Sequence, residues 1–421
     1  MPNQPVTFKT SELAEAFLGE WVSDCPFLAH TSNYIEKKFT AGNGTTINVA
    51  LPSIPKGGEG AELDEANLGY DKGSVELTLK QHNVAVAPEA AIVAHDINDL
   101  SEQVLAPYAN TLAHDVQSDL YAKALGSAGH VEIITGANPG EVSKNALRIA
   151  SMKLDKFYAA GAQRYACVDP MILAGASDFV NIFLPGEISK GIWADCAIGK
   201  FAKAEYYSMA DCRNITGVSL AGATVSDAAE GDDELELTWS TFPFSADDVI
   251  PAGLPFKVQS GTTPVYYKID MYGHKSPEEY VFVVKEDHVV TAAEVTAGAL
   301  TVKINKISTN DATTGNRALM NISALPNSVD GNDVVDVLTA GKTYATGLIY
   351  DKKAVITAQA KLAKLTGTDS RVAAESPTGA VIQCTVGQEI KQGRDIYRWD
   401  ALTGCVVPRP SWTTGLYLQM D

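Results

Sequence analysis

The sequence lacks the features that mark secreted, membrane-spanning and disulfide-bonded proteins. Its six cysteines are scattered and include no CxxC pair, which predicts reduced, mostly buried thiols. No run of about 18 apolar residues occurs, so we expect no membrane span. The N-terminus has no basic start followed by an apolar stretch, so we expect no signal peptide. These absences together favour a protein of a reducing compartment.

Positive charge is also scarce. The chain has 33 Lys and Arg against 51 Asp and Glu, a net charge of −18. Because affinity for duplex nucleic acid comes largely from Lys and Arg that neutralise phosphates, this balance argues against an electrostatic nucleic-acid surface. The plain alternative is a solvated acidic surface that favours solubility. With 45% hydrophobic residues in 421, the composition is that of a globular protein of two or three domains.

The catalytic and metal-binding motifs are missing as well. The sequence contains no GxxxxGK[ST], GxSxG or HExxH motif and no zinc spacing. His95 and His114 each precede an aspartate, but neighbours along a helix point to different faces, so we expect helix-surface or interface positions. Cys167 and Cys196 lie in apolar runs, which favours inert buried thiols.

Two acidic segments are weak candidates for a cation site. The acidic cluster of Glu230, Asp232, Asp233, Glu234 and Glu236 lacks the twelve-residue register of a calcium loop with its glycine at the sixth position, so a solvated acidic turn is favoured. Residues 330–333, Asp-Gly-Asn-Asp, have the composition of a turn. We therefore expect no catalytic residues, no cofactor and no metal site.

The first 80 residues predict an arm and an extended hairpin. Two short amphipathic stretches, Glu12–Phe17 and Phe27–Ile35, predict an arm that packs on another element. Residues 46–51 and 75–80 alternate with period two, which predicts strands. The glycine-rich, charged tip between them, about twenty residues long, has little from which to build a core and is unusual inside a compact domain. We expect a neighbouring subunit to cover it.

Helical spacing begins after the hairpin. A single apolar stripe with three- and four-residue spacing predicts a helix over residues 96–125, with Gly126 as its stop. Pro107 should kink this helix or start a second one there. Further helices are predicted at Lys144–Tyr158 and Tyr350–Leu365.

From Gly217 to about Ala340 the chain reads as a run of strands separated by turns. This segment has 7 basic and 18 acidic residues, which is −11 of the total −18. Such spacing predicts a small sandwich or barrel inserted in an α/β chain. Strands are predicted again from Val381 to Leu418. The strands predicted within the insert are Glu234–Ser240, Pro255–Ser260, Val265–Tyr272, Glu279–Glu286 and Ala299–Ile307.

In this order the segments resemble the major coat protein of short-tailed double-stranded DNA phages, the branch that carries an inserted I-domain. The resemblance covers nearly the whole chain, and the order of the segments is its specific part. The segments that carry it are Val75–Leu79 with Asp99-Leu100 and LAPYANTLAHDVQSDLYAKAL, then KLDKFYAAGAQRYACVDPMILAGA, ADCAIGKFAKAEYYSMADCRNITGV, Glu279–Val284 with AGALTVKINKI, and GRDIYRWDALTGCVVPRPSW.

The resemblance implies an α+β chain with the Hong Kong 97-type capsid fold. It also implies a structural protein that forms hexamers and pentamers of an icosahedral virion shell around double-stranded DNA, assembled in the bacterial cytoplasm with a scaffolding protein and a portal, and open to a decoration protein. The implied segments are the N-arm 1–35, the E-loop 36–92, the P-domain with its spine helix 93–149, the A-domain 150–216 and 341–380, the β-barrel I-domain 217–340, which helps folding and makes contacts between capsomers, and the returning strands 381–421.

Four lysines near the arm and hairpin are the candidate contact residues. We expect Lys37, Lys38, Lys56 and Lys72 to pair with carboxylates on adjacent subunits, because the rest of the chain is acidic. That acidity would also keep the packaged genome from adhering to the inner wall. Two other functions stay open: a secreted or surface binding protein with an Ig-like β module, and a hydrolase that uses the acidic residues.

Overall fold

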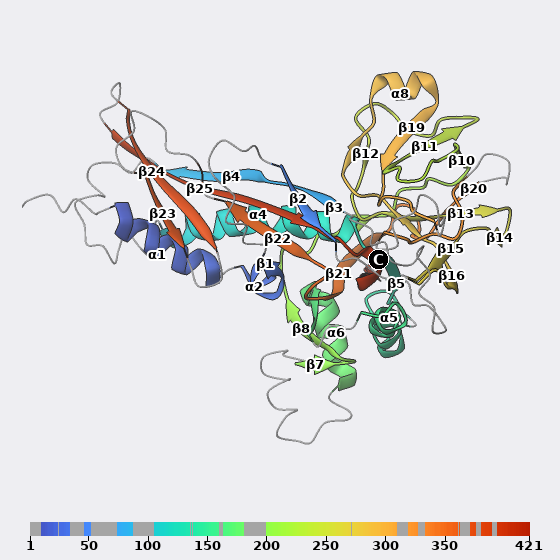
Figure 1. Cartoon of the computed structure of the whole chain (residues 1–421), viewed down its shortest axis with the longest axis horizontal. Helices are drawn as coiled ribbons and strands as arrows, with labels where there is room; N and C mark the ends of the chain where they lie inside the picture. Colours follow the sequence, from blue (N-terminus) through green and yellow to red (C-terminus); the bar gives the residue numbers. More distant parts are fainter. Residues whose placement is uncertain are drawn as a thin grey trace, which may run out of the picture. The chain divides into compact units, whose positions relative to one another are not determined.

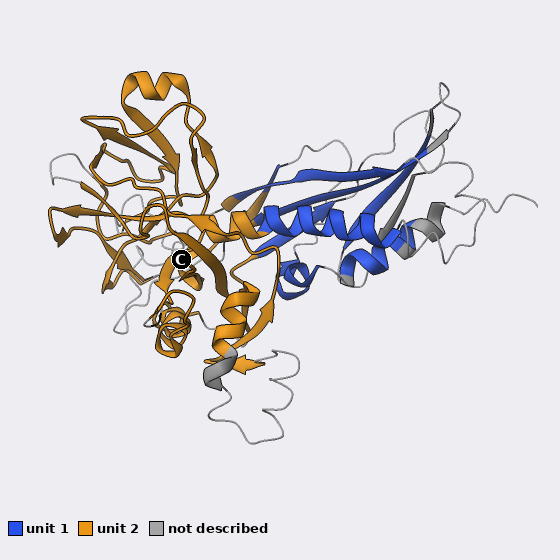
Figure 2. Ribbon diagram, turned by 180° about the vertical axis from the view of Figure 1, so that it is seen from behind, with its two compact units in different colours: residues 1–47, 76–120, 356–405 blue, residues 48–75, 121–355, 406–421 orange. Residues whose placement is uncertain are grey.

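The computed structural model describes most of the chain in two compact units (Figure 2). Unit 1 comprises residues 1–47, 76–120 and 356–405, and unit 2 comprises residues 48–75, 121–355 and 406–421. Helices and long antiparallel sheets together confirm the expected α+β class. The described residues are 10–23, 25–33, 46–51, 74–86, 105–134, 136, 138–159, 163–180, 199–270, 272–309, 319–326, 333–360, 362, 371–375, 380–389 and 394–421.

Unit 1 is built on one sheet with the order β1-β22-β25-β24-β23, to which β4 adds by pairing with β25 (Figure 1). The long strand β25 is its centre, because it pairs antiparallel with both β24 and β4. This confirms the strands predicted for the tail of the chain. The strands are β1 Ser32–Asn33, β4 Lys80–Val86, β22 Ile356–Ala360, β23 Arg371–Glu375, β24 Val381–Glu389 and β25 Arg394–Val406.

The N-terminal arm is helical and packs on this sheet of its own chain. Helix α1 (Thr10–Ser23) lies against β23 and β24, and a short helix α2 (Pro26–His30) follows. The Phe17 ring stacks on the Trp399 ring of β25 with centroids 4.7 Å apart. Because both rings are fully buried, this contact secures the arm by apolar burial and ring stacking.

The hairpin strands form where the alternating pattern places them. Strands β2 (Thr46–Ala50) and β3 (Ser74–Thr78) pair with each other. Their apolar positions Ile47, Val49 and Leu77 are buried within the chain itself. Residues 52–73, which hold the expected tip, lie outside the described residues, so its cover by a neighbouring subunit stays a prediction.

The long helix α4 runs from Ala106 to Gly126. Pro107 therefore stands at its start, where the missing backbone N–H costs nothing, and Gly126 ends it as expected. The apolar stripe is confirmed, because Leu112, Val116 and Leu120 are completely buried. The expected segment from 96 to 104 lies outside the described residues.

Unit 2 contains a mixed sheet with the order β5-β26-β21-β6-β8-β7. Helices α5 (Lys144–Lys156) and α6 (Pro170–Val180) bury their apolar sides in one core cluster with this sheet. The α5 prediction is thereby confirmed. The strands are β5 His130–Ile133, β6 Arg164–Val168, β7 Lys200–Phe201, β8 Ala204–Ser208, β21 Thr343–Asp351 and β26 Thr413–Gln419.

The helix predicted at Tyr350–Leu365 is wrong. Tyr350 lies in β21, between Thr413 of β26 and Tyr165 of β6, and Ile356–Ala360 form β22. Sheet pairing outweighs the helical spacing here, helped by the β-branched run of Val355, Ile356 and Thr357.

The insert is built mainly from strands. The predicted strand Pro255–Ser260 is confirmed with its bounds, and the other four are confirmed with shorter bounds. Its main sheet has the order β14-β13-β20-β10-β11-β19, and β17 pairs with β13. In the part of the insert that the structure describes, these pairings form a path with two ends, not the closed ring of a barrel. A short helix α8 (Ala292–Ala297), with a Thr291–Glu294 capping box, was not predicted. The strands are β10 Ala223–Val225, β11 Glu234–Trp239, β12 Val249–Ile250, β13 Pro255–Ser260, β14 Thr263–Pro264, β15 Tyr267–Ile269, β16 Lys275–Glu279, β17 Phe282–Val283, β18 His288–Val289, β19 Ala299–Lys303 and β20 Asp333–Asp336.

The chain enters and leaves the insert through a narrow neck. Strand β9 (Ile215–Thr216) pairs antiparallel with the start of β21. Gly217 donates its N–H to the Lys342 carbonyl at 2.8 Å, and Gly341 donates to the Gly217 carbonyl at 2.8 Å. A Cβ at Gly217 would lie 2.2 Å from the Thr339 carbonyl oxygen, so the neck requires glycine there.

Gly217→Ala should destabilise the protein by about 1–3 kcal/mol, because the added methyl overpacks the neck against backbone that cannot move alone. Gly387→Ala is the matched control, since a Cβ there meets nothing within 4 Å. Urea unfolding followed by circular dichroism measures both. Equal midpoints for the two variants would contradict the tight neck.

Candidate functional site

The residues predicted to act at a site are mostly not brought together by the structure. The lysines Lys37, Lys38, Lys56 and Lys72 lie outside the described residues, as do His95 and Cys196, so the lysine contacts stay a prediction. His114 is exposed on α4, as expected. Cys167 is fully buried, which is also as expected.

Among the described residues, no group of three or more His, Cys, Asp or Glu side chains is placed to hold a metal ion. In the acidic segment, the Glu230 carboxylate instead accepts hydrogen bonds from the Thr309 backbone and hydroxyl. No helix within the described ranges is long and apolar enough to cross a membrane.

The candidate site is the junction at which the insert docks on the α/β sheet of unit 2. The first part of this junction lies around Tyr417 and the end of α4 and is mostly apolar. The Tyr417 hydroxyl of β26 donates to the Gly253 carbonyl of the insert at 2.6 Å, and Tyr417 is fully buried. Gly253 has φ +87° and rests against Leu125 of α4. At the end of α4, a Cβ at Gly126 would lie 2.4 Å from the Lys285 carbonyl oxygen. The insert backbone is therefore in direct contact with the helix end.

An ion pair forms the second part of the junction. The Arg213 guanidinium, which lies just before β9, contacts both carboxylate oxygens of Asp287 at 2.7 and 2.8 Å. Asp287 also accepts the Ala252 N–H at 2.7 Å. The two parallel contacts fix the orientation of the Arg213 side chain relative to Asp287. Because both side chains are partly exposed to solvent, the ion pair contributes only modestly to stability.

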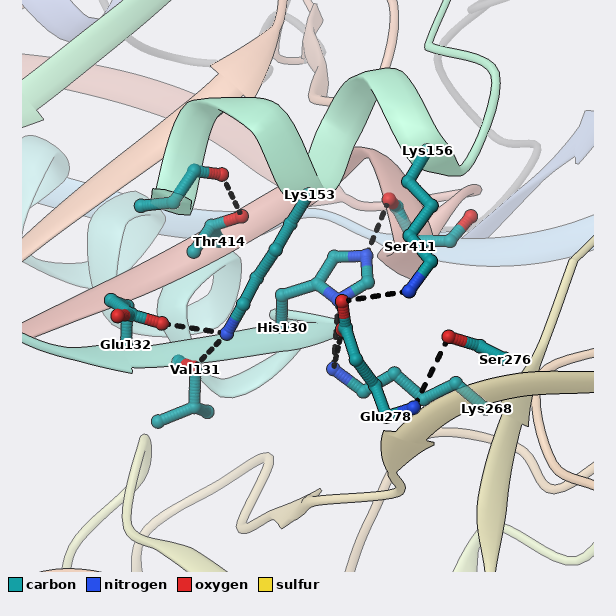
Figure 3. A network of polar contacts seen from close by, with 12 residues as sticks. His130, Val131, Glu132, Lys153, Lys156, Lys268, Ser276, Glu278, Ser411 and Thr414 are labelled. Atoms are coloured by element: carbon teal, nitrogen blue, oxygen red, sulfur yellow. Dashed lines mark hydrogen bonds and ion pairs between the residues drawn. The ribbon is translucent and has the colours of Figure 1, made fainter. Parts of the chain in front are cut away.

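The third part is a polar network between β5, α5 and the β15–β16 hairpin (Figure 3). The Lys268 amine of β15 lies 2.7 Å from His130 Nδ1 on β5. His130 Nε2 lies 3.0 Å from the Ser411 carbonyl oxygen. Since a carbonyl only accepts, Nε2 carries the proton, and Nδ1 accepts from Lys268. His130 is therefore neutral in this arrangement.

The carboxylate of Glu278 on β16 completes the network. Its Oε1 lies 3.2 Å from the Lys156 amine of α5. Its Oε2 lies 3.9 Å from both the Lys268 amine and His130 Nδ1. Beside this group, Lys153 pairs with Glu132 at 2.7 Å. Basic and acidic side chains thus alternate across the junction, and their attraction holds the hairpin against α5.

Burial sets the ionisation of the network. Desolvation and the positive charge of Lys153 together lower the pKa of Lys268 to about 7, against the opposing effect of Glu278. Burial also holds the pKa of His130 well below its ordinary value, and the charge of Lys268 acts in the same direction. Both groups are less than 5% exposed, so each is costly to protonate in place.

An exposed aromatic pair closes the rim of the junction. Tyr158, just beyond α5, meets Tyr272 of the hairpin edge-to-face with centroids 5.0 Å apart. Tyr158 has φ +57°, a strained conformation for a residue other than glycine. This backbone conformation directs the chain beyond α5 so that the Tyr158 ring contacts the hairpin.

A desolvated lysine amine is also the group that forms Schiff bases in enzymes. Here the Lys268 side chain is only 5% exposed and its amine is directed at His130, so the amine has no open path to a substrate. What the arrangement does is hold the insert in one position on the sheet.

None of the three central residues of the network, His130, Lys268 and Glu278, was predicted from the sequence to act at a site. The one signal in the sequence was Lys268 itself, which alternates with Tyr266 and Asp270 on the same face of a predicted strand, and that face is buried. A basic residue on such a face needs a partner. His130, 138 residues away, is not identifiable from the pattern.

Unfolding stability should depend on pH through Lys268. Between pH 7 and 10.5 the unfolded lysine holds a proton that the folded one does not, so the free energy of unfolding rises with pH across this window. His130 adds a loss of stability as pH falls below 6.5.

Lys268→Met should flatten the rise in thermal stability between pH 7 and 9, as measured by calorimetry. Lys203→Met removes an exposed lysine and should leave the slope as it is. A slope unchanged by Lys268→Met would show that this amine is not the titrating group.

Comparisons with known proteins yield structures only. No family model and no curated protein matches the chain. It is similar to the structures titled "Capsid of Ralstonia phage GP4" (TM-score 0.45, 7% identity, 94% of this chain and 88% of that chain), "Capsid structure of the Cyanophage P-SCSP1u" (0.42, 12%, 92% and 86%) and "Mycobacterium phage Che8" (0.41, 10%, 91% and 94%). At such identities and TM-scores, these likenesses do not by themselves assign a function.

Proposed function

We propose that this chain is a major capsid protein that self-assembles into the icosahedral shell around a phage double-stranded DNA genome. The observation that carries the proposal is the order of its parts. A helical arm, the β2–β3 hairpin and the helix α4 precede an α/β sheet that a β-rich insert interrupts at one neck. This is the element order of the Hong Kong 97-type capsid fold, which the sequence resembles.

The finer assignment is to the branch of short-tailed phages with an I-domain. In it, residues 1–35 are the N-arm, 36–92 the E-loop, 93–149 the P-domain, 150–216 and 341–380 the A-domain, 217–340 the I-domain, and 381–421 the returning strands. Pairing of β9 with β21 across the neck supports the placement of the insert, because the chain leaves and rejoins the sheet at adjacent positions.

The junction supplies a physical role for the insert in a shell. Tyr417, the Arg213–Asp287 pair and the Lys268 network attach the insert at separate points, so its outer surface has one orientation on the sheet. Lattice contacts between identical subunits need such fixed orientations to repeat around a ring. Many modest contacts of this kind then stabilise a closed shell.

The partners follow from this role. Copies of the chain form hexamers and pentamers, a scaffolding protein and a portal take part in assembly, and a decoration protein is a further partner. The shell encloses DNA without sequence-specific binding, and the chain acts without catalysis in the virion, after assembly in the bacterial cytoplasm. The Ralstonia phage GP4 and cyanophage P-SCSP1u structures, to which the chain is similar, are capsids as well.

A second candidate is a surface binding protein with the insert as an Ig-like module. The insert's rich strand content is the observation that favours it. Binding of sugars or receptor fragments by the monomer, with no particle formed, would support this alternative.

Expression of the chain with its neighbouring genes should give closed shells tens of nanometres across in electron micrographs. Absence of any particle, with and without those genes, would contradict the proposed function. The assembled fraction is measured by sedimentation.

The contact lysines are tested in the same assay. Lys56→Glu with Lys72→Glu should lower the assembled fraction, because two expected inter-subunit ion pairs become repulsive. Lys200→Glu with Lys306→Glu makes the same change of charge at exposed positions and is the control. If both double variants assemble as well as the parent, the lysine hypothesis fails while the capsid function stands.

A further inference from the structure

We propose that Cys167, Met209 and Cys212 form a binding site for a soft monovalent metal ion, of which copper(I) is the type. The site lies inside the α/β sheet of unit 2 and is independent of the proposed shell function.

The three sulfur atoms meet in the protein interior. Cys167 Sγ lies 3.8 Å from Met209 Sδ and 3.9 Å from Cys212 Sγ. The three residues are 0%, 3% and 5% exposed, respectively. Both cysteines are free thiols.

The backbone holds these side chains together through regular structure. Cys167 lies in β6, which pairs in parallel with β8, and Met209 follows β8 directly. Met209 donates its N–H to the Val168 carbonyl at 3.1 Å, and Cys212 donates to the Met209 carbonyl at 3.3 Å. A strand and a turn thus present the three sulfurs without a flexible loop between Met209 and Cys212.

The separations fit one shared ion. With metal–sulfur bonds of about 2.3 Å, sulfurs around a single ion lie about 3.8 Å apart in a tetrahedral site and about 4.0 Å apart in a trigonal one. Both separations from Cys167 lie close to this range. Two thiolates and a thioether are soft ligands, which favour copper(I) over the hard cations Mg²⁺ and Ca²⁺.

One phenol group supports the thiolates that such an ion requires. Tyr207 hydrogen-bonds to Cys167. A hydroxyl donor of this kind orients a ligand and stabilises its charge from outside the site. The Tyr207 hydroxyl is anchored by the Tyr350 hydroxyl at 2.7 Å, which leaves the Tyr207 proton for Cys167 when Tyr350 donates to it.

Binding of the ion depends on pH because a thiol must lose its proton to become a ligand. Burial raises the pKa of Cys212 well above its ordinary value, and the neighbouring Cys167 raises it further. The ion must therefore displace protons, so its affinity should increase with pH.

The test is a titration of the purified full chain with copper(I), free of oxygen, in a phosphine reductant, against the competing chelator bicinchoninate. We expect one equivalent per chain and tighter binding at pH 8 than at pH 6. X-ray absorption should show sulfur neighbours at about 2.3 Å. Thermal stability should rise with the concentration of the ion, since it binds the folded state.

Variants separate this site from other thiols. Cys167→Ser or Cys212→Ser should abolish stoichiometric binding, and Met209→Leu, which keeps the volume, should weaken it by about 10-fold or more. Cys25→Ser and Cys384→Ser are the controls and should bind as the parent does, with circular dichroism confirming that each variant is folded.

The proposal would be overturned by an absence of stoichiometric binding by the parent chain, by equal losses in the control variants, or by nitrogen or oxygen neighbours in the absorption spectrum. Tight binding that Met209→Leu leaves unchanged would reject the three-sulfur site in favour of a simple thiol pair.

Discussion

Strand β21 is the constraint on which the rest of unit 2 depends. It pairs with β26 from Tyr344 to Tyr350, with β6 on its other side and with β9 at its start. Eight of its nine residues are buried, so the strand is a core element on both faces. Because β21 begins directly after the insert, any error in how the insert returns would shift the register of the central sheet.

The polar network at the junction fixes the position of the β15–β16 hairpin more than it stabilises the folded protein. Placing Lys268 and His130 out of water is unfavourable, and the single hydrogen bond between them recovers only part of that cost. Apolar residues of similar volume often hold two elements together as strongly as a buried polar pair does. The distances to Ser411 and Glu278 are satisfied together in one placement of the hairpin, and that selects its position.

Local pattern was sufficient where one side of an element is apolar. The stripe on α4, the alternation in β2 and β3 and the strands of the insert were predicted from the sequence because burial of one face imposes a regular spacing. The same reasoning failed for residues 350–365, where the pairing of β21 and β22 with neighbouring strands outweighs the helical spacing. It also missed α8, a helix of six residues whose signal in the sequence is the Thr291–Glu294 capping box.

The sequence by itself determined the kind and order of most elements, the free buried state of the five described cysteines and the acidic insert, since these depend on composition and on neighbours along the chain. Only the tertiary structure decided which distant residues meet. His130 meets Lys268, Arg213 meets Asp287, and Cys167 meets Met209. These contacts depend on how strands far apart in sequence pair and on how the insert docks, and no periodic pattern in the chain encodes such long-range pairings.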